Sequence, residues 1–128
     1  MDLEEKVVTF LRMKNAMLAE IGVYSLCKTK EMASNVAVRQ DLILKRLQLI
    51  ENWLLLLDSD ETFIVEHHLI DGMSWPTLTS EYKKRWPDAP KAERTLVRKQ
   101  AGAVGKIVAF TKGYFNILEY LLLDFPTR

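Results

Sequence analysis

Apolar residues recur every three or four positions along most of the chain, which is the period of amphipathic helices. In the first segment they alternate with charged residues and fall at Leu3, Val7, Phe10, Leu11, Met17, Leu18 and Ile21. This pattern predicts a helix over residues 3–21. Residues 25–34 have no clear period, so we expect a connection there, unless the apolar residues just before it continue the helix.

A second helix is expected to begin at Ser34 or Asn35, because either side chain can cap a helix N-terminus. Its apolar seam has a heptad-like spacing, at Val36, Ile43, Leu47, Ile50, Leu54 and Leu57. Such a seam suits packing against the first helix or against another chain, so residues 1–57 are predicted to form an N-terminal helical hairpin. The run at residues 53–57 is wider than one seam needs, which indicates burial on more than one side.

Cap and turn signals divide residues 58–110 into three further helices. Asp and Ser can cap a helix start, Gly accepts the left-handed conformation at a helix end, and Pro stops a helix or enters its first turn. These signals are, in chain order, the acidic segment 58–61, Asp71 with Gly72, Ser74 with Pro76, and Trp86 with Pro87. The third helix is expected to follow a turn at residues 88–90.

The third of these helices has one apolar side and one basic side. Its predicted core side carries residues four, three and four positions apart, namely Leu96, Gln100, Ala103 and Ile107. An advance of about 100° per residue turns a second set outward, namely Arg94, Arg98 and Gly105, with Lys91, Ala101 and Gly102 close by. Each Gly costs a helix roughly 1 kcal/mol against Ala, so we expect a DNA backbone or another helix to approach this side closely.

Residues 111–128 are strongly apolar up to Pro126. Either the third helix continues through Gly113, or a short final helix packs back on the chain. Apolar residues occupy almost every face between Tyr114 and Leu123, which favours a subunit interface. The fold prediction is therefore all-α, with the hairpin at 1–57, three helices at 58–110 and an apolar C-terminal helix at 111–128, packed as one compact unit.

The composition places this chain of 128 residues among ordinary globular proteins, with 48% hydrophobic and 27% charged residues. Its lone Cys27 cannot form an internal disulfide, which fits a reducing compartment. The acidic N-terminus lacks the basic start of a signal peptide, and no apolar run is long enough to cross a bilayer. We therefore expect a cytoplasmic protein without membrane contact.

The charge of the chain is unevenly distributed. The whole chain carries +1, but residues 83–106 hold 8 Lys/Arg against 2 Asp/Glu, whereas residues 1–82 hold 8 against 13. The basic segment is thus +6 and the preceding part −5. Such a segment is either a phosphate-binding surface or a solvated basic face with no ligand, and the direction of its side chains decides between them.

Residues 55–108 resemble region four of bacterial sigma factors. The likeness is carried by the turn Gly72-Met73-Ser74-Trp75, by Arg94-Thr95-Leu96-Val97-Arg98, and by Ala103-Val104-Gly105-Lys106-Ile107. More closely, the segment is similar to phage-encoded regulators of the ArpU and RinA type, which share this helix-turn-helix. The resemblance implies a sequence-specific, double-stranded DNA-binding transcriptional regulator of phage or prophage genes, whose third helix enters the major groove.

The resemblance also assigns roles to individual residues. The base-reading positions of the family fall on Glu93, Arg94, Val97 and Arg98. In a major groove, Arg can contact guanine through two hydrogen bonds and Glu can accept one from cytosine. The remaining cations of the basic segment are expected to contact the DNA backbone, namely Lys83, Lys84, Arg85, Lys91, Lys99 and Lys106.

Other chemistry is weakly supported by the sequence. The adjacent His67 and His68 point about 100° apart on a helix and cannot easily share one metal ion, so we expect one to face the core and the other the solvent. Trp53, Trp75 and Trp86 lie on apolar stripes, which favours packing over stacking on bases. We expect no catalytic residue, no metal, no cofactor and no enzymatic activity.

Double-stranded DNA is the expected partner, bound by a homodimer that forms through the N-terminal helices, the C-terminal apolar helix, or both. RNA polymerase is a further candidate partner. Two other functions fit the same pattern. The chain could be a small oligomeric phage DNA-packaging or assembly subunit with the same helix-turn-helix, or an interaction module whose N-terminal seam binds a polymerase subunit.

Overall fold

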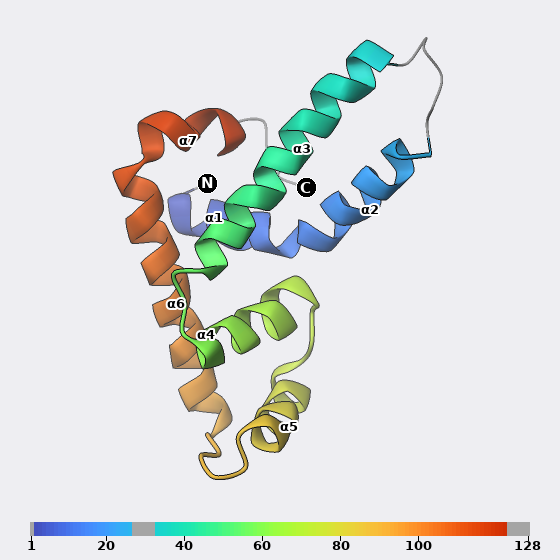
Figure 1. Ribbon diagram of the computed structural model, residues 1–128. Helices are drawn as coiled ribbons and strands as arrows, with labels where there is room; N and C mark the ends of the chain where they lie inside the picture. The colour runs from blue at the N-terminus through green and yellow to red at the C-terminus, as the bar shows by residue number, and fades with distance from the viewer. Residues whose placement is uncertain (1, 27–32, 123–128) are drawn as a thin grey trace.

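The computed structural model describes residues 2–26 and 33–122, and within them every regular element is helical and no strand occurs. The elements are α1 (Leu3–Arg12), α2 (Lys14–Tyr24), α3 (Ala33–Leu54), α4 (Ser59–Ile64), the π-helix η2 (Val65–Ile70), α5 (Trp75–Arg85), α6 (Glu93–Gly113) and α7 (Phe115–Leu122) (Figure 1). The all-α prediction is confirmed. No helix in the described part of the chain is both long and apolar enough to span a membrane.

The single helix predicted for residues 3–21 is wrong, because the chain bends at Met13 and forms two helices, α1 and α2 (Figure 1). The bend turns Met17 into the core that α1 lines with Phe10 and Leu11, and it leaves Leu18, predicted for the same stripe, 48% exposed. The helix also continues past Gly22 to Tyr24. Tertiary packing thus overrides a simple helical stripe.

The second predicted helix, α3, packs against α2, and Arg39 on α3 bonds Glu20 on α2 at 2.8 Å. It is helical from Ala33, so Ser34 and Asn35 lie inside it and the prediction of a cap at either is wrong. Part of the predicted connection, residues 27–32, lies outside the described residues. The helix ends at Leu54, and Leu55, in the run expected to be buried, is 83% exposed.

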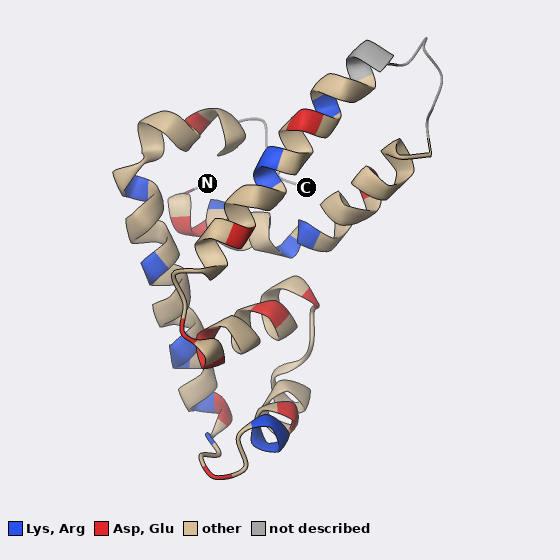
Figure 2. Ribbon diagram, viewed as in Figure 1, with Lys and Arg blue, Asp and Glu red and all other residues tan. Residues whose placement is uncertain are grey.

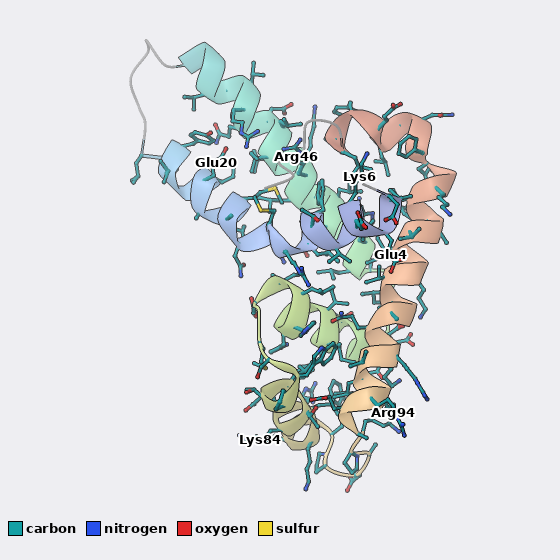
Figure 3. The ribbon with its side chains drawn as sticks, turned by 180° about the vertical axis from the view of Figure 1, so that it is seen from behind. Glu4, Lys6, Glu20, Arg46, Lys84 and Arg94 are labelled. Atoms are coloured by element: carbon teal, nitrogen blue, oxygen red, sulfur yellow. The ribbon has the colours of Figure 1, made fainter. Side chains whose placement is uncertain are left out.

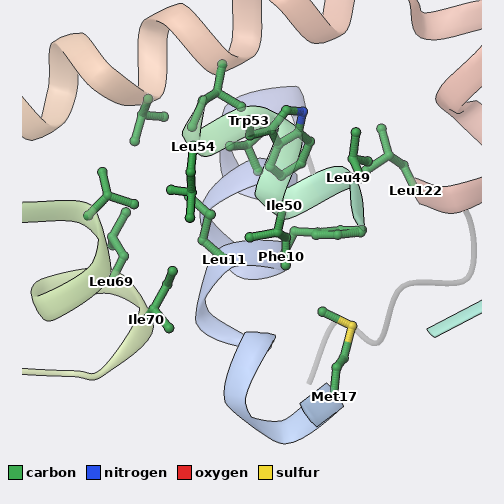
Figure 4. Close-up of a cluster of buried hydrophobic side chains, with 14 of the residues drawn as sticks. Phe10, Leu11, Met17, Leu49, Ile50, Trp53, Leu54, Leu69, Ile70 and Leu122 are labelled. Atoms are coloured by element: carbon green, nitrogen blue, oxygen red, sulfur yellow. The ribbon is translucent and has the colours of Figure 1, made fainter. Parts of the chain in front are cut away.

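Two hydrophobic cores lie along α6. The first core joins α1, α3, η2 and α7 to the C-terminal half of α6, with Phe10, Trp53 and Ile107 fully buried (Figure 4). The second core is smaller and joins the end of α4 to α5 and the start of α6. Its buried members are Ile64, Leu78, Tyr82 and Leu96, and the half-buried residues packed on them are Phe63, Met73, Trp75 and Trp86.

A single helix, α6, contributes residues to both cores, and the chain reverses direction after it. α6 continues to Gly113, so the predicted boundary between residues 110 and 111 falls inside a helix. The short α7 then packs against α3, where Nε of the buried Arg46 donates to the carbonyl oxygen of Leu121 at 2.9 Å. Both parts of the C-terminal alternative therefore occur, a third helix that extends through Gly113 and a final helix that packs back.

Candidate nucleic-acid interface

The turn that leads into α5 forms as its residue types predict. Gly72 has a φ of +73°, the left-handed conformation that side chains disfavour. Ser74 is the N-cap of α5, where its Oγ accepts from the N–H of Thr77 at 3.4 Å, and Pro76 lies in the first turn. α5 ends at Arg85, just before Trp86 and Pro87. These local signals fix where α5 begins and ends.

Aromatic side chains of the second core hold α5 against the end of α4. Trp86 contacts Phe63 edge to face, with ring centroids 5.2 Å apart, and lies 4.6 Å from Tyr82. The guanidinium carbon of Arg85 lies 5.2 Å above the same Trp86 ring, within cation–π range. Leu78 and Leu96 are fully buried between α5 and α6. The core therefore fixes the first turns of α6 relative to α5.

The exposed side of α6 agrees with the predicted helical periodicity. Leu96, Ala103 and Ile107 are fully buried, and Gln100 on the same side is half-buried. All four predicted base-reading positions are exposed to solvent, namely Glu93, Arg94, Val97 and Arg98. α6 thus presents two arginines outward within its first two turns.

Five of the six predicted backbone contacts are also exposed, all but Lys99, and four of them lie at the end of α5 or just before α6. Lys83, Lys84 and Arg85 form the last turn of α5, and Lys91 precedes α6. Figure 2 shows this basic colouring at the same end of the molecule as the start of α6, and Figure 3 labels Arg94 and Lys84 there, far from Arg46 on α3. Within residues 2–26 and 33–122, only Lys84 of these four forms an ion pair, with Glu81 at 3.1 Å, and both partners are exposed.

Lys99 and Lys106, the other two predicted backbone contacts, point to the acidic first turn of α4 instead. Nζ of Lys99 lies 2.7 Å from Oδ2 of Asp60, and Nζ of Lys106 lies 2.7 Å from Oε1 of Glu61. Asp58 lies 3.8 Å from the same Lys106 nitrogen. From the sequence, this acidic turn is expected only to cap its own helix and to supply acidic charge at the helix start, so the cross-helix pairs were not predicted.

The ion pairs change the acidity of their members. Partial burial acts to raise the pKa of Glu61, but hydrogen bonds from Lys106 and from the N–H of Asp58 outweigh it and lower the pKa. Asp60 behaves alike, since its pKa is lowered by Lys99 against the effect of burial. The pKa of each lysine is raised, chiefly by the hydrogen bond to its carboxylate. All four groups are therefore charged near neutral pH.

The two histidines do not divide into one core and one surface residue, so that prediction is wrong. Both are half-buried in η2. Nδ1 of His67 lies 2.8 Å from the carbonyl oxygen of Phe63, and its ring stacks on the Phe63 ring. Nδ1 of His68 lies 2.7 Å from Oε1 of Gln100, and its ring stacks on Trp75. The two rings lie against different neighbours because adjacent residues of a helix point in different directions.

The glycines of α6 lie on its open side. A Cβ added at Gly102 or Gly105 meets no atom within 4 Å, so no other part of the described chain packs closely there. Within the described residues, no group of three or more His, Cys, Asp or Glu could hold a metal ion. The exposed face of α6 is thus basic at its start and bare of side chains at Gly102 and Gly105.

The three tryptophans pack rather than stand free. Trp53 is fully buried in the first core, 5.2 Å from the ring of Phe10, and Trp75 and Trp86 are half-buried against the second core. The packing prediction is therefore confirmed for all three.

Comparison with models of protein families, with curated proteins and with solved structures finds nothing that matches this chain.

Proposed function

We propose that the protein binds double-stranded DNA and places the first turns of α6 in the major groove. One observation carries the proposal: three successive segments bring exposed cations to one end of the molecule. The last turn of α5 supplies Lys83 and Arg85, the connection supplies Lys91, and α6 supplies Arg94 and Arg98. None of these five forms an ion pair within the described part of the chain. Cations without ion-pair partners that gather on one exposed surface suit phosphate-rich partners.

The resemblance to sigma region four and to ArpU-type and RinA-type regulators makes the proposal more specific. The protein would read a DNA sequence through Glu93, Arg94, Val97 and Arg98 and regulate phage or prophage transcription without catalysis, in the cytoplasm of the host. Lys83, Lys84, Arg85 and Lys91 would contact phosphates and set the affinity. Nothing on α6 beyond Arg98 is both exposed and basic until Lys106. The reading positions therefore lie in the first two turns.

The test is duplex binding by wild type and by two variants of α6, measured by fluorescence anisotropy from low to physiological salt. Arg94→Ala together with Arg98→Ala removes two outward charges at the start of the helix. Lys112→Ala is the matched control, since it removes an exposed charge of the same helix at its other end. We expect the double variant to bind at least tenfold more weakly, roughly 1–3 kcal/mol per base contact, and the control to bind as wild type does.

The result that contradicts the proposal is wild-type protein that binds no duplex at low salt, where electrostatic binding is strongest. Equal losses in the double variant and the control would instead place DNA contact elsewhere on the surface. Wild-type protein that binds no duplex would favour the alternative function, a module that binds a polymerase subunit.

We further propose that the DNA-binding form is a homodimer. Exposed apolar side chains occur at Tyr114, just before α7, on α7 at Ile117 and Tyr120, and toward the outer ends of α2 and α3, at Val23 and Val38. Apolar groups of this size are candidates for a subunit interface. The mass of the protein in solution tests this proposal: a dimer suits an operator-binding regulator, whereas a ring of many copies favours the DNA-packaging alternative.

A further inference from the structure

The acidic first turn of α4 holds α6 at two places. The Asp60–Lys99 and Glu61–Lys106 distances are both 2.7 Å. Because the lysines are seven residues apart, they leave α6 at positions about two helical turns, or about 10 Å, apart along its axis. A single ion pair would leave the helix free to rotate about that point. Two pairs at this spacing constrain both the angle and the axial position of α6 relative to α4.

Both carboxylates are themselves fixed by other contacts. Glu61 is 7% exposed, and its Oε1 also accepts from the N–H of Asp58 at 2.9 Å. Oδ1 of Asp60 accepts from the N–H of Glu61 at 2.9 Å. The acidic turn is therefore held by its own backbone amides as well as by α6.

We propose that these two ion pairs, which we call the α4–α6 clasp, position Arg94 and Arg98 for reading bases, and that Lys99 and Lys106 are not phosphate contacts. The inference rests on the proposed function of α6. A guanidinium reads guanine through two hydrogen bonds of fixed direction. If α6 shifts relative to α4, its cations still attract phosphates, but the arginines lose their preference for one base sequence. Phosphate contacts cannot replace that preference, because they carry no sequence information. Asp60, Glu61, Lys99 and Lys106 are thus positioning residues for specificity.

Glu61→Gln separates this role from phosphate binding by Lys106. The amide keeps the size of the side chain and can still accept from Asp58, but it removes the charge that holds Lys106. If Lys106 bound phosphate, the substitution would free it and remove a negative charge, so every duplex would bind more tightly. The clasp predicts a different result: the affinity for the selected duplex falls relative to the affinity for a scrambled duplex.

The experiment first uses wild-type protein to select a preferred site from randomised duplexes. Affinity for the selected and a scrambled duplex is then measured over a range of NaCl concentrations for Glu61→Gln, Lys106→Met, the double variant, and Lys106→Arg as the conservative control. We expect Glu61→Gln and Lys106→Met each to lower the ratio of the two affinities by roughly fivefold, and the double variant to be no worse than either. Lys106→Arg should retain the wild-type ratio, since it can pair with Glu61.

The scrambled duplex distinguishes positioning from a merely structural role. Loss of folded protein would lower both affinities by the same factor and leave their ratio unchanged, which overturns the clasp. A salt slope that falls by about 0.9 in Lys106→Met makes Lys106 a phosphate contact and also overturns it. Wild type that binds no duplex at low salt, or selects no site, overturns the proposed function and the clasp together. If wild type selects a site and the variants keep the wild-type ratio of affinities, the clasp alone is overturned.

Discussion

The two cores on α6 differ in size and in what else supports them. Among the described residues the first core has 17 buried members and the second has 4, so hydrophobic burial favours the first by a wide margin. The second core is also supported by an edge-to-face contact of Phe63 with Trp86, by the stacking of His68 on Trp75, and by ion pairs between α4 and α6. The end that we propose to bind DNA is therefore the less strongly packed end. Its geometry depends more on directional polar contacts, which set orientation better than they add stability.

The largest effect is expected in the first core. Phe10→Ala removes a fully buried ring that packs on Trp53 and leaves a cavity among α1, α3 and η2. We expect a loss of about 3–5 kcal/mol in the free energy of unfolding, measured by urea denaturation followed by circular dichroism. A loss below 1 kcal/mol would show that this core is not the main source of stability.

A smaller effect with a more local consequence is expected in the second core. Leu78→Ala empties a fully buried position between α5 and α6, with a loss of about 2–3 kcal/mol. Hydrogen exchange should show faster exchange in α4 and α5, while α1 and α3 stay protected. Equal loss of protection in both regions would mean that the cores unfold as one unit, and the comparison between them would fail.

The glycines of α6 give a prediction of opposite sign. Gly102→Ala and Gly105→Ala add a methyl group that meets no atom within 4 Å, so each should stabilise the free protein by about 1 kcal/mol through helix propensity. Thermal denaturation measures this gain. If the open side of α6 approaches DNA closely, the same variants bind duplex more weakly. Stabilised variants with unchanged affinity would place the glycines outside the interface.

The smallest effect is expected from acid, and it should be confined to the second core. Asp60 and Glu61 have a lowered pKa in the folded protein, so their contribution to stability is present above their ordinary values of 3.8 and 4.5 and is lost as pH falls below them. The difference in melting temperature between wild type and Glu61→Gln should therefore shrink below about pH 4.5. A difference that stays constant down to pH 3 would show that the charge of Glu61 adds nothing.

Local signals predicted the candidate site well where they depend on one or two residues. Gly72, Ser74 and Pro87 marked the ends of helices correctly, because each acts through its own backbone preference. The outward direction of Arg94 and Arg98 followed from the position of Leu96 on the same helix. The ion pairs of Lys99 and Lys106 did not follow, because their partners lie about 40 residues earlier in the chain and helical periodicity carries no information across that separation.

The all-α class, the turn before α5 and the basic, outward side of α6 could be predicted from the sequence, because cap chemistry and helical periodicity act over a few residues. Three features became apparent only in the folded protein: the bend at Met13, the two cores along one helix, and which cations of the basic segment form ion pairs within the described residues. The physical reason is the same in each case. Burial and ion pairing depend on which helices meet, and the pairing of Lys106 with Glu61 exists only because α6 packs against α4.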